Sequence, residues 1–286
     1  MNTSILLCAC PDRPGVVARV TSFLHTYGAN LVHADHHADL SEKVSFLRLE
    51  WETEGFSLDP SGFRAAFSPI ADSMGMTWSV HHSDAQTKVG ILVSAQDHCL
   101  VDLLHRFSTG ELDGSCVFIA GNHEAPSAFA KHYGVGWTTL ESKAGDDDTK
   151  RRSEQKILEL CREHDVGLLV LARYMQVLTG RFLSQTTFPT LNIHHSFLPA
   201  FKGGRPYHQA WERGVKVIGA TAHYVTEDLD EGPIVAQDVA RVSHRDTVDD
   251  LVRKGRDLEK LVLARAVRLH LSHRVLRHRH RTVVFD

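Results

Sequence analysis

The sequence lacks the features that mark several classes of protein. No apolar run reaches the roughly 20 residues that a membrane-spanning helix needs. The N-terminus meets the segment Pro11-Asp12-Arg13-Pro14 early and has no basic region of the kind that begins a secretory signal. The formal net charge is only −3, so the sequence lacks the excess of basic residues that is typical of proteins that bind nucleic acid or a membrane surface. These absences favour a cytoplasmic globular protein, with one large domain or two smaller ones in 286 residues.

Cysteine is scarce, with five residues, whereas histidine is abundant, with 20. An odd number of cysteines argues against a disulfide framework and fits a reducing compartment. We expect Cys8 and Cys10 to be buried strand residues rather than metal ligands, because a structural metal site usually has four protein ligands. The segment 270–281, HLSHRVLRHRHR, carries so many arginines that we expect a solvated basic end there and no metal.

Residues 1–83 show the pattern of a small domain with one sheet and two helices. Helical spacing of apolar residues predicts helices at 16–28 and 60–74. Shorter apolar runs predict strands at 5–10, 30–38, 44–51 and 76–82. The order βαββαβ is that of a ferredoxin-like sandwich.

The turns of this first domain carry a resemblance. Asp12 and Gly15 in Asp-Arg-Pro-Gly, with Asn30 in Gly-Ala-Asn-Leu, resemble the motifs of ACT domains, which sense small ligands in amino-acid and one-carbon metabolism. The resemblance implies either a small amino-acid effector bound near these three residues or a purely structural oligomerisation module. A homodimer or homotetramer is expected in either case.

Residues 84–286 form a second domain in which strands and helices alternate. Strands are predicted at 89–94, 117–120, 136–140, 167–171, 190–193 and 217–225. Helices are predicted at 97–107, 126–132, 150–164 and 247–270. This alternation predicts an α/β domain with a doubly wound, mostly parallel sheet, in which ligands bind beyond the carboxyl ends of the strands.

The stretch Leu191–Phe201 carries the first candidate catalytic residues. Strand alternation places Asn192 and His194 on one face, where an amide and an imidazole can stabilise an oxyanion. A single histidine at a strand end is more often structural than catalytic. The pair His194-His195 suggests zinc, but alternation sends the two rings to opposite faces and no third ligand is suitably spaced, so we expect no metal.

The acidic loop 226–231 supplies a candidate base. Leu229 before Asp230, with Gly232-Pro233 after it, is expected to hold this carboxylate against the sheet. Partial burial raises the pKa of a carboxylate and makes it a better base. The other carboxylates of the loop are expected to be a solvated turn.

These pieces match a known family in order and spacing. Asn192-x-His194, Ser196–Pro199, Gly219-x-Thr221-x-His223 and Asp230-x-Gly232 resemble the enzymes that use formyltetrahydrofolate, which include glycinamide ribonucleotide formyltransferase and the formyltetrahydrofolate deformylases. The resemblance covers about residues 88–270 and implies a formyltransferase-like fold. It also implies that Asn192, His194 and Asp230 are the catalytic residues. The substrate-binding residues that it implies are Arg173, Met175, Val177, Leu178, Arg205, His223 and Thr226.

Two features favour the hydrolase over the transferase within this family. The transferases of phosphorylated ribonucleotides bind phosphate on a glycine-rich loop, whereas the segment 93–100 has no glycine and carries Asp97. The arrangement of an ACT-like domain before the catalytic domain resembles the deformylases. The resemblance therefore implies hydrolysis of a linear amide, in which 10-formyltetrahydrofolate and water give formate and tetrahydrofolate.

The implied mechanism is direct attack of water on the N10-formyl carbon, with Asp230 as the base and no cofactor beyond the folate substrate. Two alternatives stay open: a formyltransferase with an unphosphorylated amine acceptor, and a non-catalytic folate-binding regulator. The complete set of Asn192, His194 and Asp230 argues against the regulator. Whether the formate serves purine synthesis or folate recycling also stays open.

Overall fold

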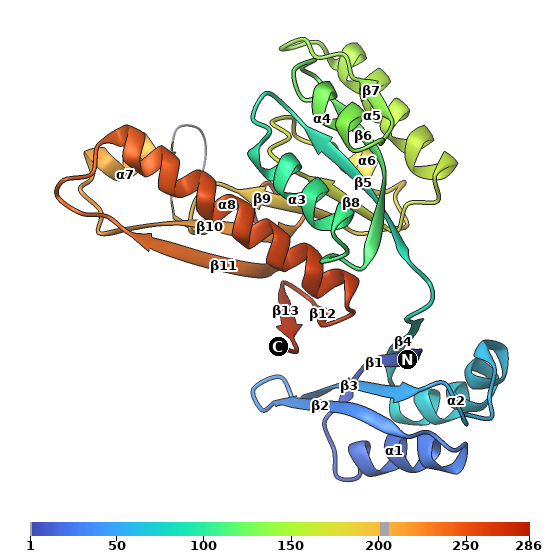
Figure 1. Cartoon of the computed structure of the whole chain (residues 1–286). Coiled ribbons are helices and arrows are strands. Elements are labelled where there is room, and N and C mark those ends of the chain that lie inside the picture. Colours follow the sequence, from blue (N-terminus) through green and yellow to red (C-terminus); the bar gives the residue numbers. More distant parts are fainter. Residues whose placement is uncertain (1, 201–205) are drawn as a thin grey trace. The chain divides into compact units, whose positions relative to one another are not determined.

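The chain divides into two compact units in the computed structural model, which describes residues 2–200 and 206–286 (Figure 1). The first unit contains the residues up to Gln86 together with His273–His278 and Val283–Asp286. The second unit contains Thr87–Ser272 and Arg279–Thr282. The boundary thus follows Gln86 rather than residue 83, and the end of the chain, which we had assigned to the second domain, returns largely to the first unit.

The first unit has the predicted βαββαβ order and an antiparallel sheet in the order β2-β3-β1-β4. Its elements are β1 (Thr3–Pro11), α1 (Val16–Thr26), β2 (Leu31–Asp39), β3 (Val44–Glu52), α2 (Pro60–Met74) and β4 (Thr77–His82). The Asp59 side chain accepts a hydrogen bond from the Gly62 amide and so caps the start of α2, and Gly75, with φ 62°, follows its last residue as the C-cap. Both helices pack on one face of the sheet through Leu24, Trp51 and Phe67.

The other face of this sheet is covered by the C-terminal residues. Strands β12 (Val275–His278) and β13 (Arg281–Val284) pair as a hairpin. Leu276 and Phe285 pack against Leu7 and Phe46, and Phe285 is buried. The expectation of a solvated basic end was therefore wrong, because apolar residues between the arginines give the segment an inner side that the sheet can bury.

The second unit is built on a seven-stranded sheet in the order β11-β10-β9-β8-β5-β6-β7. Its strands are β5 (Thr87–Val93), β6 (Gly114–Gly121), β7 (Trp137–Thr139), β8 (Leu168–Leu171), β9 (Thr190–His194), β10 (Val217–Tyr224) and β11 (Ile234–Arg241). Strands β5 to β9 are parallel, whereas β10 and β11 run antiparallel to their neighbours. The predicted doubly wound, mostly parallel sheet is confirmed, although β11 was not foreseen.

Helices cover both faces of this sheet (Figure 1). They are α3 (His98–Ser108), α4 (Ser127–His132), α5 (Asp147–Glu163), α6 (Gly180–Leu183), α7 (Pro206–Glu212) and α8 (Val248–Leu271). Helix α8 contacts α3, α7 and strands β9 to β11, while α5 and α6 pack on the other face through Ile157, Leu171 and Phe182. The strand order reverses between β5 and β8, so this is the position where such sheets usually bind ligands.

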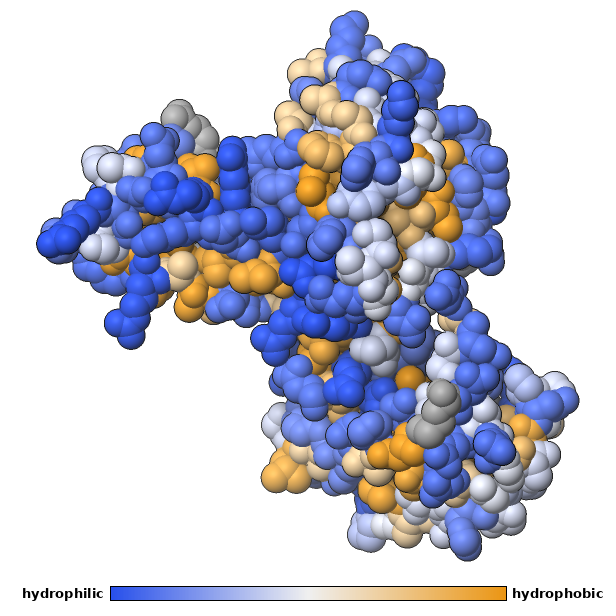
Figure 2. Space-filling model, in the orientation of Figure 1, coloured by the Kyte–Doolittle hydropathy of each residue, from blue (hydrophilic) through white to orange (hydrophobic). Residues whose placement is uncertain are grey.

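The surface is that of an ordinary globular protein, with hydrophilic residues over most of the visible face and apolar patches between them (Figure 2). Among the helices of the described residues, none combines the length and the apolar character needed to cross a bilayer.

Candidate active site

Strands β9 and β10 bring three polar side chains together. Asn192 and His194 lie near the end of β9, and the antiparallel register places His223 of β10 opposite Asn192. The amide Nδ2 of Asn192 lies 3.2 Å from Nε2 of His223. The predicted pairing of Asn192 and His194 on one side is thus confirmed, with His223 as their direct neighbour.

The loop after β10 carries Asp230 to these residues. Asp230 has φ 57°, a left-handed backbone that few residues other than glycine adopt. Gly232 lies so close to β10 that a Cβ there would be 1.7 Å from the carbonyl oxygen of Tyr224. Leu229 is 61% exposed and does not press Asp230 against the sheet as we had expected. The close approach of Gly232 therefore anchors the loop.

Two histidines surround the Asp230 carboxylate. Its Oδ2 lies 3.2 Å from Nδ1 of His194, and its Oδ1 lies 3.7 Å from Nε2 of His223. Burial acts to raise the pKa of Asp230, but hydrogen bonds and charge from the two histidines outweigh it and hold this pKa well below the usual range. The expected rise in pKa was wrong, and Asp230 is an anion at neutral pH.

The hydrogen bonds define what each ring can donate. Nδ1 of His223 lies 3.0 Å from the carbonyl oxygen of Tyr224, so this nitrogen carries a proton and donates. Nε2 of His223 faces both the Asn192 amide and the Asp230 carboxylate, and the Asn192 amide keeps a second hydrogen available. Nε2 of His194 is buried and has no hydrogen-bond partner among the described residues. His194 and Asn192 can therefore both donate to an oxygen placed between them.

A pocket with a volume of about 210 Å³ opens beside these four residues. Residues of the segment 171–178 and the loop 225–230 form its walls. The apolar side chains of Met175 and Val177 are 56% and 52% exposed, whereas Leu178 is buried in the core behind them. The exposed pair gives the pocket an apolar wall that a flat aromatic ligand can contact.

The substrate-binding residues that we expected mostly meet at this pocket. Its lining includes Arg173, Met175, Val177, Leu178, His223 and Thr226. The Thr226 side chain is exposed, and its hydroxyl donates to the carbonyl oxygen of Asp228 at 3.1 Å, which stabilises the turn. Arg205 lies outside the described residues.

A buried carboxylate that the sequence analysis missed lies next to the pocket. Glu259 of α8 is 1% exposed; it accepts from the Tyr207 hydroxyl at 2.6 Å and lies 2.8 Å from Nε2 of His98. Nε of Arg173 lies 3.3 Å from Glu259, and the same guanidinium donates to Gln96 at 3.0 and 3.2 Å. We call these five residues the Glu259 cluster. An acidic residue within the apolar stripe of α8 was the available signal.

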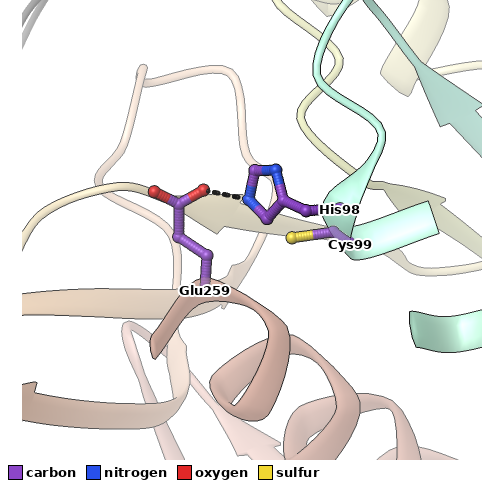
Figure 3. Close-up of side chains that lie close together, drawn as sticks. All are labelled: His98, Cys99 and Glu259. Carbon is purple, nitrogen blue, oxygen red and sulfur yellow. Dashed lines mark hydrogen bonds and ion pairs between the residues drawn. The ribbon is translucent and has the colours of Figure 1, made fainter. Parts of the chain in front are cut away.

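The Glu259 cluster is not built to bind a metal, although His98, Cys99 and Glu259 lie close together (Figure 3). Burial, together with the charge of Glu259, raises the pKa of the Cys99 thiol well above its usual value, so it is no thiolate ligand. The Arg173 guanidinium already neutralises Glu259. Burial acts to raise the pKa of Glu259, but its bond to His98 and the charge of Arg173 outweigh this and lower the pKa.

The neighbouring histidines His194 and His195 lie on the same side, with ring centroids 5.0 Å apart. The expected divergence of the two rings was wrong because β9 ends at His194 and strand alternation ends with it. Burial, and then the charges of Arg173 and His194, lower the pKa of His195 to about 4, so its ring is neutral at pH 7. The His195 ring also contacts Tyr207 of the Glu259 cluster.

The three candidate effector residues of the first unit do not form one site within the chain. Asp12 and Gly15 lie in the turn that follows β1, near residue 43, since the Asp12 amide donates to the Lys43 carbonyl. Asn30 lies at the other end of β3, where its amide donates to Glu52 at 2.6 Å. Strand β3 separates them by roughly 26 Å at 3.3 Å per residue.

The fold and the site together define the class of protein. Residues 87–267 match the formyl transferase family, and residues 4–49 match the ACT domain. The chain is 49% identical to a formyltetrahydrofolate deformylase from Synechocystis over 99% of its own length and 98% of that protein. The structure of a formyltetrahydrofolate deformylase from Pseudomonas syringae, 44% identical, superposes with a TM-score of 0.96 over 100% of this chain and 95% of that one.

A transferase of the same class is less similar. Glycinamide ribonucleotide transformylase 1 from Symbiobacterium toebii is 31% identical, with a TM-score of 0.65, over 70% of this chain and 95% of that protein. The similarity to the deformylases extends over both units, whereas the transferase matches a smaller part. The chain belongs to the formyltetrahydrofolate deformylase family.

Proposed function

We propose that this protein hydrolyses 10-formyltetrahydrofolate to formate and tetrahydrofolate, and that Asn192, His194 and Asp230 carry out the reaction. The observation that supports this most strongly is the convergence of two donors and one anionic acceptor at one end of an apolar-walled pocket. Family membership supports the choice of substrate, and the geometry of the site supports the roles proposed for the three residues.

In the proposed reaction, Asp230 accepts a hydrogen bond from the attacking water and orients its oxygen toward the formyl carbon. As the carbon becomes tetrahedral, its former carbonyl oxygen turns into an oxyanion that Asn192 Nδ2 and His194 Nε2 stabilise. His194 donates from Nε2 in the form that carries protons on both ring nitrogens, and in that form its Nδ1 donates to the Asp230 carboxylate.

The low pKa of Asp230 favours release of the proton that it accepts from water. A carboxylate with a low pKa binds a proton weakly, so Asp230 passes the proton that it takes from water on to N10 of the leaving folate. The bond between the formyl carbon and N10 then breaks, and formate and tetrahydrofolate leave. His223, held by the Tyr224 carbonyl, keeps Asn192 and the carboxylate in place.

We propose that folate binds with its ring system between the segment 174–178 and the loop 225–230. Apolar contacts from Met175 and Val177, together with backbone groups of both segments, would hold a flat heterocycle that has polar edges. No cofactor or metal takes part in this scheme, since the polarising groups are Asn192 and His194.

An assay with purified protein, 10-formyltetrahydrofolate and EDTA, without any amine, tests the function. We expect formate and tetrahydrofolate in equal amounts. Turnover that begins only after glycinamide ribonucleotide is added would identify a transferase, and activity that EDTA abolishes and zinc restores would identify a metalloenzyme.

The first unit supports a proposal about regulation and assembly. We propose a homodimer or homotetramer, because no strand among the described residues pairs with the outer edge of β2 and such edges are commonly paired between copies. A small amino acid would bind at the turn of Asp12 and Gly15. Sedimentation that shows a monomer at micromolar concentration, and calorimetry without heat for any common amino acid, would each count against its part of the proposal.

A further inference from the structure

The crevice where this type of sheet usually binds ligands is closed by the chain itself. At the switch between β5 and β8, the Ser94 amide donates to the Arg173 carbonyl at 3.3 Å. The Met175 amide donates to Oγ of Ser94 at 2.9 Å. The segments that follow these two strands are therefore hydrogen-bonded to each other.

The Glu259 cluster fills the same region with side chains. Arg173 extends from a backbone with φ 63° to Glu259, and the exposed Gln96 covers its guanidinium. Tyr207 of α7 lies directly on α8, so closely that a Cβ at Gly255 would be 2.1 Å from its Cζ atom. Arg173 and Tyr207 are both less than one-tenth exposed. The crevice is therefore packed rather than open.

The Glu259 cluster borders the reaction site. Arg173 and His195 line the pocket beside Asn192, His194 and Asp230, and the His195 ring contacts both His194 and Tyr207. Nη1 of Arg173 is buried without a hydrogen-bond partner among the described residues. The packed guanidinium therefore occupies volume beside the reaction site that a nucleophile larger than water would need.

We propose that the Glu259 cluster is a specificity device that excludes primary amines from the formyl carbon and leaves water as the only acceptor. This proposal rests on the proposed hydrolysis and deepens it. Without the Arg173 side chain, an amine nitrogen could attack the formyl carbon and the bond from that carbon to N10 would break. The ammonium proton would move to N10, so that an N-formylamine and tetrahydrofolate form without formate.

The substitution Arg173→Gly is the sharpest test, because glycine adopts φ 63° without strain and Glu259 keeps its bonds to His98 and Tyr207. Asp165→Gly is the matched control, since it also replaces a left-handed residue, with φ 53°, but at an exposed position. Gln96→Ala is a second variant that uncovers the crevice and leaves Arg173 paired with Glu259.

Each variant is incubated with 10-formyltetrahydrofolate and glycinamide, and the ratio of N-formylglycinamide to formate is measured by mass spectrometry. Wild type and Asp165→Gly should give almost only formate. Arg173→Gly should raise the ratio by about 10-fold to 100-fold, the usual range for steric discrimination in a pocket, and Gln96→Ala by less. The ratio does not depend on how much of the protein is active.

Two results would overturn the proposal: wild-type protein that formylates glycinamide as readily as Arg173→Gly does, or an unchanged ratio in both crevice variants. If Arg173→Gly does not fold, Gln96→Ala decides, and an unchanged ratio there rejects the exclusion. A wild-type protein that releases no formate at all would instead refute the proposed hydrolysis.

Discussion

At the scale of single residues, the site depends on how one carboxylate is held. Asp230 lies between His194 and His223, and these rings keep it ionised although it is largely buried. The carboxylate in turn fixes the proton on Nδ1 of His194, a residue that lines the pocket, and Nε2 has no partner among the described residues. The charge of Asp230 and the ability of His194 to donate a hydrogen bond therefore depend on each other.

Replacing Asp230 by Asn removes the charge and keeps a side chain of nearly the same size and shape. We expect Asp230→Asn to lower kcat by about 10²-fold to 10⁴-fold, as is typical when a group that handles the proton is removed. KM should change by only a few-fold, because the folate contacts are apolar and backbone contacts. Asp228→Asn, an exposed position in the same loop, is the control and should be nearly silent. Equal losses in the two variants would show that the wrong carboxylate has been assigned.

Protonation of His195 makes the stability of the folded protein depend on pH in the acid range. Its pKa is about 4 in the folded protein and ~6.5 in an unfolded chain, so the unfolded state binds more protons between these values. The contribution of His195 to the free energy of unfolding is therefore fully present above pH ~6.5, and up to about 3 kcal/mol of it is lost as the pH falls toward 4.

The substitution His195→Gln should flatten this part of the pH dependence in urea unfolding experiments on the second unit. His105→Gln, at an exposed position of α3, is the control. A wild-type slope between pH 4 and 6.5 that survives in His195→Gln would reject the assignment.

At the scale of elements, the site depends on one loop that glycine allows to touch a strand. A Cβ at Gly232 would overlap the Tyr224 carbonyl and would also lie 3.3 Å from Nδ1 of His223. The loop that carries Asp230 therefore cannot reach its position with any larger residue there. The strand supports the loop directly, which explains why Leu229 is free to be exposed at its tip.

The substitution Gly232→Ala should displace the loop and lower kcat by about 10²-fold, because small displacements of reacting groups have effects of this size. The fold should persist, with a lower melting temperature. Gly136→Ala adds the same methyl group where no atom lies within 4 Å, and it should leave kcat unchanged. Normal turnover in Gly232→Ala, measured as formate release, would contradict the proposed position of Asp230.

The elements that positioned the catalytic residues were largely predictable. Apolar runs gave β9 and β10, and alternation within β9 gave the shared side of Asn192 and His194. Strand β11 was missed because its polar and charged residues, Gln237 and Asp238 among them, break the apolar run that marked the buried strands. The pKa of Asp230 could not be predicted because it depends on His194 and His223, which are distant in sequence.

The Glu259 cluster lay beyond sequence reasoning for a related reason. Its members come from α3, α7, α8 and the segments after β5 and β8, and apart from Gln96 and His98 they are all far from one another in sequence. The same holds for the C-terminal hairpin, whose arginines and histidines dominated its composition. A smaller set of apolar residues decides where the hairpin packs, because Leu276, Val283 and Phe285 contact apolar residues of the first sheet.

At the scale of the whole molecule, the first unit is completed by the end of the chain. Besides the apolar contacts, the carbonyl of His273 accepts from Nε of the buried Arg48 at 3.1 Å. Rings of His81 and His273 stack with centroids 3.7 Å apart. The C-terminal residues thus accept a hydrogen bond from the buried Arg48 guanidinium and cover apolar surface that the first sheet would otherwise expose.

Removing the Phe285 ring should therefore weaken the first unit. We expect Phe285→Ala to lower the free energy of unfolding of that unit by about 3 kcal/mol, the lower end of the range for a buried phenylalanine. Leu40→Ala, at a position 82% exposed in the same unit, should have almost no effect. Equal stability of the two variants in urea titration would mean that the hairpin does not pack on the sheet.

The central claim is that water attacks the formyl carbon directly at the site of Asn192, His194 and Asp230. The most direct test is a single turnover of wild-type protein with 10-formyltetrahydrofolate in ¹⁸O-labelled water, with EDTA and without any amine. We expect formate that carries one ¹⁸O atom, in equal amount to the tetrahydrofolate formed. Unlabelled formate in that first turnover would indicate transfer through a protein carboxylate, and no formate at all would contradict hydrolysis itself.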